Sequence, residues 1–410
     1  MRNARSRLIG ASAILAAPAI IFTPVVNANT LTGLIPDLYT GLDVVSRELV
    51  GFIPSVYRNV GAERAAVNQY VDYPLSQQKA AFNIAPAMAI PEPSDSTTGM
   101  GQMKITKARG VEFGWTGEEQ RGLNTAVGYV SVQAGNFAQA LRTLCNEIEV
   151  DLAVEAAANA SRATGTAGTT PFASDLSATA NLRKILDDNG APLSDRSLII
   201  DTSAGAKLRT LTQLTKANEA GTTMTLRQGE LLDLHGFSLK ESAGIQSKTA
   251  GTASGATTNN AGYAVGATVL TLASAGTGTL TAGESVTFAG DSNIYQIVSG
   301  DADVSNGGTI TIAEPGLRVA MSAATKAITV VASHTSNIGF VQSALHLVAR
   351  PPAIPSEGDA AADRRLIVDP RSGLTFEVAI YLGYRKVRLE VVLAWGVKAV
   401  APRHIAMLLG

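Results

Sequence analysis

The sequence predicts an α+β fold that carries an inserted all-β domain, and two observations lead to this prediction. Helix-like and strand-like segments succeed one another over most of the chain. Between Gln246 and Ser333, however, the residues change to Gly, Ala, Thr and Ser with short β-branched runs, such as Ala267–Leu272 and Gly308–Ile312. Insertions succeed where a surface loop of the host has its ends close together. We therefore expect residues 246–333 to form a compact inserted β-domain, after which the host chain resumes.

The composition favours a protein that covers much of its surface with partners. The chain has 410 residues, which is enough for two or three domains, but only 16% of them are charged and the mean hydropathy is +0.15. Such a chain must bury surface against partners or lie near a membrane. A net charge of −1 gives no general electrostatic footprint for nucleic acid. The single cysteine, Cys145, excludes an internal disulfide and is expected to be a small core residue on a helix.

The first 28 residues have two interpretations. Three arginines precede an apolar run from Leu8 to Val26, and a small residue follows at Ala28. A charged start, an apolar centre and a small-residue end are typical of a secretory signal peptide. Alternatively, residues 1–28 are an N-terminal extension added by a misassigned start codon, because Asn29–Gly33 is a natural beginning for a folded chain. The residues alone leave both interpretations open.

Residues 36–51 predict a helix with one apolar stripe. Pro36 and Asp37 are placed as helix starters usually are. The stripe advances in steps of four, three and four residues and consists of Leu38, Leu42, Val45 and Leu49. Such a stripe needs a partner surface, either in the same protomer or on a neighbour.

The region from Val71 to Gly122 predicts an extended arm. Several prolines forbid a long helix here, and Lys104–Trp115 alternates as a strand does. We expect a long strand–turn–strand arm with its tip at Ser94–Gly101. Basic residues on the returning strand could contact a phosphate backbone, although charges that keep a solvated strand edge from aggregating are the preferred interpretation. These residues are Lys104, Lys107 and Arg109.

The strongest helix prediction covers Gln133–Arg162. At about 1.5 Å per residue, its length gives a rod of about 45 Å, which suits a spine on which other elements pack. The last turns, Ala153–Ala160, are rich in alanine, so other backbone can approach them closely. The apolar stripe advances in steps of four, three, four and four residues and consists of Phe137, Leu141, Leu144, Ile148 and Leu152.

The segments that follow predict a mixed α and β subdomain. Asp175–Asp188 predicts a helix, and Asn189–Gly190 turns the chain. Arg196–Ile200 predicts a buried strand and Ala204–Lys216 a further helix. The order helix, turn, strand, helix is typical of α/β or α+β architecture. The first helix points three apolar residues inward, namely Leu182, Ile185 and Leu186.

The C-terminal segments return to strand patterns. Thr375–Leu382 and Lys386–Leu393 are expected to pair across the turn Gly383–Arg385, and Val397–Val400 and Pro402–Leu409 follow. These strands must pack on the long helix, because neither could bury its apolar face alone. The first strand places four apolar residues on one face, namely Phe376, Val378, Ile380 and Leu382.

No motif in the chain predicts catalysis or a cofactor. Gly276–Gly278 lacks the third glycine of a dinucleotide fingerprint, and Asp301–Gly307 resembles a calcium loop only superficially because its twelfth position is Ile312. Ser203 and Ser343 lack the surroundings of a nucleophile. A glycosylation sequon at Asn159 lies on a predicted helix and is discounted. We predict no catalytic, cofactor-binding or metal-ligating residues, no cofactor and no enzyme activity.

The four histidines are widely separated in the sequence. His235 and His346 flank the insertion at mirrored places and could sit on neighbouring host strands. Neither they nor His334 and His404 belong to a metal-binding helix motif, so we expect structural histidines.

Several separated segments resemble, in order, the coat proteins of tailed bacteriophages of the P-twenty-two-like branch. They are residues 29–39, 44–53, 369–377 and 391–405. The resemblance covers essentially all of residues 29–410, and its specificity comes from the agreement of several segments in order.

This resemblance implies the Hong Kong-type capsid fold. In that fold an arm and an extended loop reach over neighbouring subunits, a peripheral domain carries a long spine helix, and an axial domain gathers at the five- and six-fold axes. After the N-terminal extension at 1–28, the implied parts are the N-arm (29–72), extended loop (73–122), peripheral domain with spine helix (123–174), axial domain (175–245), inserted β-domain (246–333), return to the axial domain (334–373) and peripheral-domain strands with the C-terminus (374–410).

The resemblance also implies a function. The chain would be a major capsid protein that self-assembles, as pentamers and hexamers, into the icosahedral shell of a tailed bacteriophage or prophage around packaged double-stranded DNA. Its partners would be a scaffolding protein, a portal protein and a decoration protein, with non-specific DNA contact at most and no membrane. The protein would reside in the virion after assembly in the host bacterial cytoplasm, which favours the start-site interpretation of residues 1–28. The alternative is a secreted bacterial surface or adhesion protein.

Overall fold

The computed structural model describes residues 50–75, 81, 84, 86, 99–126, 129–211, 233–369 and 373–410. The predictions for the N-terminal extension, for the helix at 36–51 up to residue 49 and for most of the arm's tip lie outside these residues. The described chain mixes helices with many strands, so the α+β prediction is confirmed.

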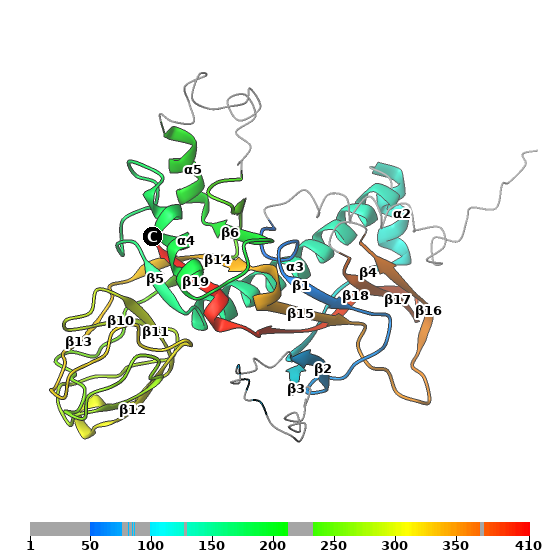
Figure 1. Ribbon diagram of the computed structural model, residues 1–410. Helices are drawn as coiled ribbons and strands as arrows, with labels where there is room; N and C mark the ends of the chain where they lie inside the picture. Colours follow the sequence, from blue (N-terminus) through cyan, green and yellow to red (C-terminus); the bar gives the residue numbers. More distant parts are fainter. Residues whose placement is uncertain are drawn as a thin grey trace, which may run out of the picture.

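One half of the molecule is built on a six-stranded sheet (Figure 1). Its strands are β1 (Tyr57–Val60), β4 (Lys107–Thr116), β15 (Leu345–Arg350), β16 (Ala361–Val368), β17 (Thr375–Gly383) and β18 (Lys386–Ala399). The long strand β18 is central: β4 runs along one edge, while β17 and β15 share the other edge. All these pairs are antiparallel, and β1 joins β15 in parallel.

The short helix α2 (Gly117–Ala126) is followed in the chain by a long helix, α3 (Tyr129–Ala158). Helix α3 packs across the six-stranded sheet, against β18 and β4. All five residues of the predicted stripe are buried, and they contact Phe376, Ile380 and Leu393 of the sheet in one core. The spine-helix prediction is thus confirmed up to residue 158 and wrong for its last turn. There, the Ser161 backbone N–H and its hydroxyl both bond to the Ile405 carbonyl, which draws Arg162–Thr164 into strand β5.

The other half is an eleven-stranded sheet. Its host strands are β5, β6 (Arg196–Ile200), β7 (Ser238–Glu241), β14 (His334–Val341) and β19 (Ile405–Leu409), and the short β8 (Ser247–Lys248) at the start of the following segment pairs with β14. Helices α4 (Ser177–Asp188) and α5 (Thr202–Thr210) share a second core with these strands. The buried strand β6 and the inward residues of α4 are as predicted, whereas the helix predicted at 204–216 starts earlier, after the cap Asp201, and is already extended at Leu211.

The C-terminal segment divides between the two sheets. Residues 374–410 were expected to return together to the peripheral sheet, and β17 and β18 do pair in the six-stranded sheet. The last strand, β19, lies between β14 and β5 instead, because the 3-10 turn η3 (Pro402–His404) redirects the chain. Leu382 is a further correction: it is 55% exposed, since it lies beside the exposed turn residue Tyr384, beyond the edge of the core.

Residues 246–333 fold around a core of their own. The strands are β9 (Val269–Leu272), β10 (Ser285–Phe288), β11 (Ile294–Ser299), β12 (Gly308–Ile312) and β13 (Ile328–Val330). Entry and exit lie side by side, because β8 pairs with the start of β14 and the Ala250 N–H donates to the Ser333 hydroxyl at 3.0 Å. In Figure 1 this part, which we call the insert, lies at one end of the molecule. Its strand β11 pairs with β5, so it also extends the host sheet.

A two-stranded antiparallel pair lies below the six-stranded sheet and packs against β15 and β18 (Figure 1). Strand β2 (Tyr70–Leu75) pairs with β3 (Gly99–Lys104) in antiparallel fashion, as the predicted strand–turn–strand arm requires. The continuous strand predicted over Lys104–Trp115 is interrupted, because Ile105 is fully buried and bonds back to Gln69 while Thr106 bonds to Trp395. The returning chain therefore leaves the two-stranded pair and enters the main sheet as β4.

Candidate functional site

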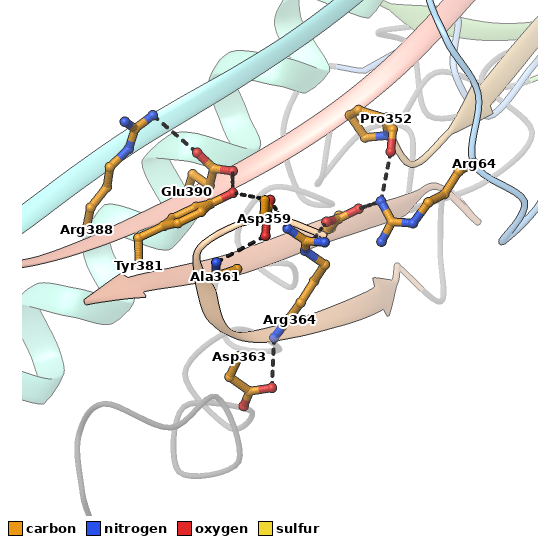
Figure 2. Close-up of polar contacts among 10 residues, drawn as sticks. Arg64, Pro352, Asp359, Ala361, Asp363, Arg364, Tyr381, Arg388 and Glu390 are labelled. Atoms are coloured by element: carbon orange, nitrogen blue, oxygen red, sulfur yellow. Dashed lines mark hydrogen bonds and ion pairs between the residues drawn. The ribbon is translucent and has the colours of Figure 1, made fainter. Parts of the chain in front are cut away.

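A polar network occupies the face of the six-stranded sheet that points away from α3 (Figure 2). Residues alternate between the two faces of a strand, so Phe376 and Val378 in the helix-side core place Glu377 on the opposite face. The Glu377 side chain is only 3% exposed. Its two oxygens lie 2.6 Å from Arg64 Nη1 and 2.7 Å from Arg364 Nε. Because a buried carboxylate needs such partners, these pairs tie β17 to β16 and to the segment before β2.

The network continues towards the β17–β18 turn. Arg364 also pairs with Asp359, whose carboxylate accepts a hydrogen bond from the Ala361 N–H at 3.0 Å. The Tyr381 hydroxyl lies 3.1 Å from Asp359 and 2.9 Å from Glu390. Burial, followed by the hydrogen bond to Glu390, raises the pKa of Tyr381 to about 12, so this phenol stays neutral at physiological pH.

Arg388 extends the network to the sheet edge, where it pairs with Glu390 at 3.2 Å and with Glu112 of β4. Exposed pairs of this kind contribute only about 0–1 kcal/mol each. Cations and anions alternate from the Arg64 segment across β16, β17, β18 and β4, and each is matched by its neighbours. This arrangement cross-links strands and contains neither an activated nucleophile nor a free general base.

A second polar centre lies inside the host core at Glu149 of α3. Its carboxylate accepts hydrogen bonds from the backbone N–H groups of Phe52 and Ile53, both at 3.0 Å, and from the Ser242 hydroxyl at 3.1 Å. Burial raises the pKa of Glu149 to about 7, although these three donors and Lys240 act in the opposite direction. Glu149 thus joins the segment before β1, the long helix and the turn after β7.

The basic residues of the returning strand face the long helix. Lys107 Nζ lies 2.7 Å from Asp151, which also accepts a hydrogen bond from the Trp395 indole at 2.8 Å. Arg109 lies 3.5 Å from Glu147. Both side chains therefore pair with α3, which neither the phosphate interpretation nor the solvated-edge interpretation anticipated. Lys107 is half-buried, whereas Arg109 and Lys104 are exposed.

The four histidines do not come together. His346 lies in β15, where its ring contacts Tyr57 at 4.6 Å and Tyr73 at 5.4 Å between centroids. His235 lies in the turn before β7 with Nδ1 2.6 Å from the Thr179 hydroxyl, so the expectation that these two occupy neighbouring strands is wrong. His334 is buried at the exit of the insert and His404 is half-buried in η3; burial lowers the pKa of both.

The remaining candidate residues have structural surroundings. Cys145 is buried in the host core, and burial raises the pKa of its thiol to about 12, as expected for a packing residue. Ser203 donates its N–H to the cap Asp201, and Ser343 lies in the short turn η2 (Gln342–Ala344). Asn159 follows α3 and donates its side-chain amide to the Glu155 carbonyl at 3.0 Å.

The Asp301–Gly307 segment is a turn held by its own side chains. Asp303 caps the short helix η1 (Val304–Asn306) by accepting from the Ser305 N–H at 3.1 Å, and Asp301 accepts from the Asp303 N–H at 2.9 Å. Within the described residues, no group of three or more His, Cys, Asp or Glu side chains could hold a metal ion. Nor does any helix among them have the length and apolarity needed to cross a membrane.

Sequence reasoning missed the two polar centres of the host. The signal was a carboxylate within an apolar pattern: Glu149 follows Ile148 of the helix stripe, and Glu377 lies between Phe376 and Val378. Such a position demands a buried partner, but the sequence does not indicate which distant residue provides it.

No protein-family model matches the sequence, and no curated protein matches it. The structure is similar to the capsid of the cyanophage P-SCSP1u, with 13% identity, a TM-score of 0.46 and coverage of 88% of each chain. It is also similar to the asymmetric unit of the bacteriophage PhiM1 mature capsid, with 8% identity, a TM-score of 0.44 and coverage of 87% of this chain and 86% of that one. A virus-like particle from Pyrococcus furiosus is similar at 12% identity and a TM-score of 0.41, with coverage of 91% and 98%. Scores of this size do not by themselves place the chain in a family.

Proposed function

We propose that this protein is the major capsid protein of a tailed bacteriophage or prophage, with the Hong Kong-type fold of the P-twenty-two-like branch. The observation that carries the proposal is the order of elements along the chain: a two-stranded antiparallel pair, a 30-residue helix, a second sheet with its helices, an inserted β-unit and returning strands. This order is the one that the coat-protein resemblance of residues 29–410 implies.

The geometry suits a shell subunit. The long helix and the network around Glu377 stiffen one broad sheet from both faces. Such a sheet can bear mechanical stress within a shell. The two-stranded pair exposes apolar side chains, with Tyr70 at 56% and Met100 at 74% exposure, which a neighbouring copy would cover. Burial contributes roughly 25 cal/mol per Å², so many modest contacts stabilise a lattice without one tight pair.

The proposal assigns parts and partners. Residues 29–72 form the N-arm, 73–122 the extended loop, 123–174 the spine-helix region, 175–245 with 334–373 the axial domain, and 246–333 the inserted domain. The two strands β17 and β18 complete the peripheral domain, while β19 belongs with the axial sheet. Pentamers and hexamers of the chain assemble in the bacterial cytoplasm with a scaffolding protein and a portal protein, enclose double-stranded DNA and accept a decoration protein. The role is structural, without catalysis.

Electron microscopy of the expressed protein tests this function. The chain beginning at Asn29 is produced together with the scaffolding gene of its genome, and closed, uniform particles are expected. A persistent monomer under all assembly conditions would refute the proposal. Cleavage after Ala28 with recovery of the protein from the periplasm or medium would instead support the secreted surface protein.

A deletion of the insert tests its architectural role. Removing residues 249–332 keeps the pairing of β8 with β14, so the host core is expected to fold, although β5 loses its partner β11. We expect soluble protein that assembles poorly or into particles of altered size, as judged by sedimentation and microscopy. Normal particles from this deletion would show that the insert is dispensable.

A further inference from the structure

One buried arginine joins the host to the insert. Arg162, the first residue of β5, is 4% exposed. Its Nη1 donates a hydrogen bond of 3.0 Å to the side-chain oxygen of Asn293 in the insert. Its Nη2 donates at 3.3 Å to the side-chain oxygen of Asn189 and lies 3.5 Å from Asp188, both at the end of α4. A single planar guanidinium therefore contacts both parts of the protein at fixed angles.

The partners of this arginine are themselves held in place. Asn293 donates its side-chain amide to Asp291 at 2.6 Å, and its N–H donates to the same carboxylate oxygen at 2.9 Å. On the host side, Asn189 donates to the Ser161 hydroxyl at 3.0 Å and to the Arg403 carbonyl at 2.7 Å. Because both partners are oriented by further bonds, the guanidinium has one position that satisfies them together.

Tyr295 and Arg318 of the insert extend this group of contacts. Tyr295, the neighbour of β5 in the sheet, accepts the Arg318 N–H at 2.9 Å and lies with its hydroxyl 2.6 Å from Asp291. Arg318 in turn donates to the Asp188 carbonyl at 3.4 Å. The insert is thus attached along β11 as well as through its two chain connections.

The junction is not completely filled near the end of α3. Small residues of the α3 end and of the insert, among them Ala153, Ala157, Ala282 and Gly283, line a cavity of about 150 Å³. Elsewhere along the junction, Ile294 and Val331 of the insert pack against the host core. To these apolar contacts the Arg162 guanidinium adds directional hydrogen bonds to both parts, and such bonds can set an angle.

We propose that Arg162 is a positioning residue that fixes the orientation of the insert on the host. Its guanidinium couples Asn293 to the end of α4, and this coupling holds the short β5–β11 pairing together. If the protein is a capsid subunit, as proposed above, the coupling presents the far end of the insert to neighbouring subunits at one angle. Lysine at this position keeps the charge but loses the planar fork.

We call this coupling of Asn293 to the end of α4 through Arg162 the clamp. Hydrogen exchange on the full, unassembled chain tests it. In Asn293→Ala and Arg162→Lys, we expect exchange of the amides of Ile294, Tyr295 and Ala163 to accelerate by at least about tenfold, since a hydrogen bond to a charged group is lost. Protection in β9 and β12 is expected to stay unchanged. Arg183→Gln is the matched control, because it removes an arginine of α4 that contacts no insert residue. If Arg162→Lys does not fold, Asn293→Ala decides.

The outcomes separate the clamp from the proposed function. Unchanged exchange at β5 and β11 in both variants overturns the clamp. Accelerated exchange, together with particles as uniform as those of the wild type, overturns its role in presenting the insert to neighbours. Absence of particles from the wild-type chain counts against the proposed function and leaves the exchange result to decide the clamp.

Discussion

The core beneath the six-stranded sheet and the core of the insert fix their backbones by different means. The host core buries charged side chains with distant partners, such as Glu149 with Phe52 and Ile53. The insert buries a carboxylate too, that of Glu284, but its partner Thr281 is only three residues away. The insert chain reverses at glycines: ten of the sixteen glycines with positive φ among the described residues lie within 246–333. The host therefore relies on buried polar contacts between distant segments, whereas the insert relies on local contacts and on glycines in its turns.

The largest expected effect is a substitution that destabilises the host core and leaves the core of the insert folded. Phe137 of α3 is fully buried and packs edge-on against Phe113, with ring centroids 4.9 Å apart. Phe137→Ala should lower the free energy of unfolding of the host by about 3–5 kcal/mol through lost burial and a cavity. Denaturant unfolding of the unassembled chain measures this, and hydrogen exchange should show β9–β12 still protected. The control Val154→Ala, half exposed on the same helix, should cost under about 0.5 kcal/mol.

Glu149 is expected to give the host a pH dependence of its own. Burial raises the pKa of Glu149 from its ordinary 4.5 to about 7, so the folded protein binds this proton more tightly than the unfolded chain does. The resulting stabilisation is complete below about pH 4.5 and is lost as the pH rises through about 7, by a total on the order of 3 kcal/mol.

Glu149→Gln provides the comparison, because an amide does not titrate. The difference in free energy of unfolding between wild type and variant, measured by urea titration from pH 4.5 to 8, should shift in favour of the variant as the pH rises. A difference that stays constant over this range would show that Glu149 is charged throughout.

The smallest effect compares two glycines of the insert that share a φ of +90°. A Cβ at Gly278 would lie 2.3 Å from the Thr252 carbonyl oxygen, whereas a Cβ at Gly290 would meet nothing within 4 Å. Gly290→Ala should cost about 1 kcal/mol from backbone strain, and Gly278→Ala about 2 kcal/mol more, because backbone must also move. Exchange rates in β9 and β12 report the cost. Equal effects of the two substitutions would mean that close approach does not limit the insert.

Periodic patterns in the sequence correctly predicted which side chains of a helix or strand are buried. The stripe from Phe137 to Leu152 and the short buried strand Arg196–Ile200 were correct, because each side chain's burial follows from its own spacing. The same patterns did not predict which distant residue or strand each segment contacts. Nothing near Thr106 indicates that it bonds to Trp395, and nothing near Arg162 indicates that the helix ends before it to complete a strand beside β19.

The polar centres show the same limit. A carboxylate at position 149 or 377 can be recognised as unusual from its neighbours, yet Ser242 and Arg64 are far away in sequence. Only the topology brings them together. The strand-linking network uses common arginines, glutamates and tyrosines, so no residue type in the sequence marks it.

Strand β18 has a consequence for the order in which the protein folds. It is the common partner of β4, β15 and β17, and all three precede it in the chain. During synthesis the apolar stripe of the long helix therefore stays partly uncovered until residues 386–399 have been made. The core of the insert, by contrast, is complete once β13 has been made. Contacts so distant in sequence slow folding. The insert is thus expected to be a finished body attached to an unfinished host for the last part of translation.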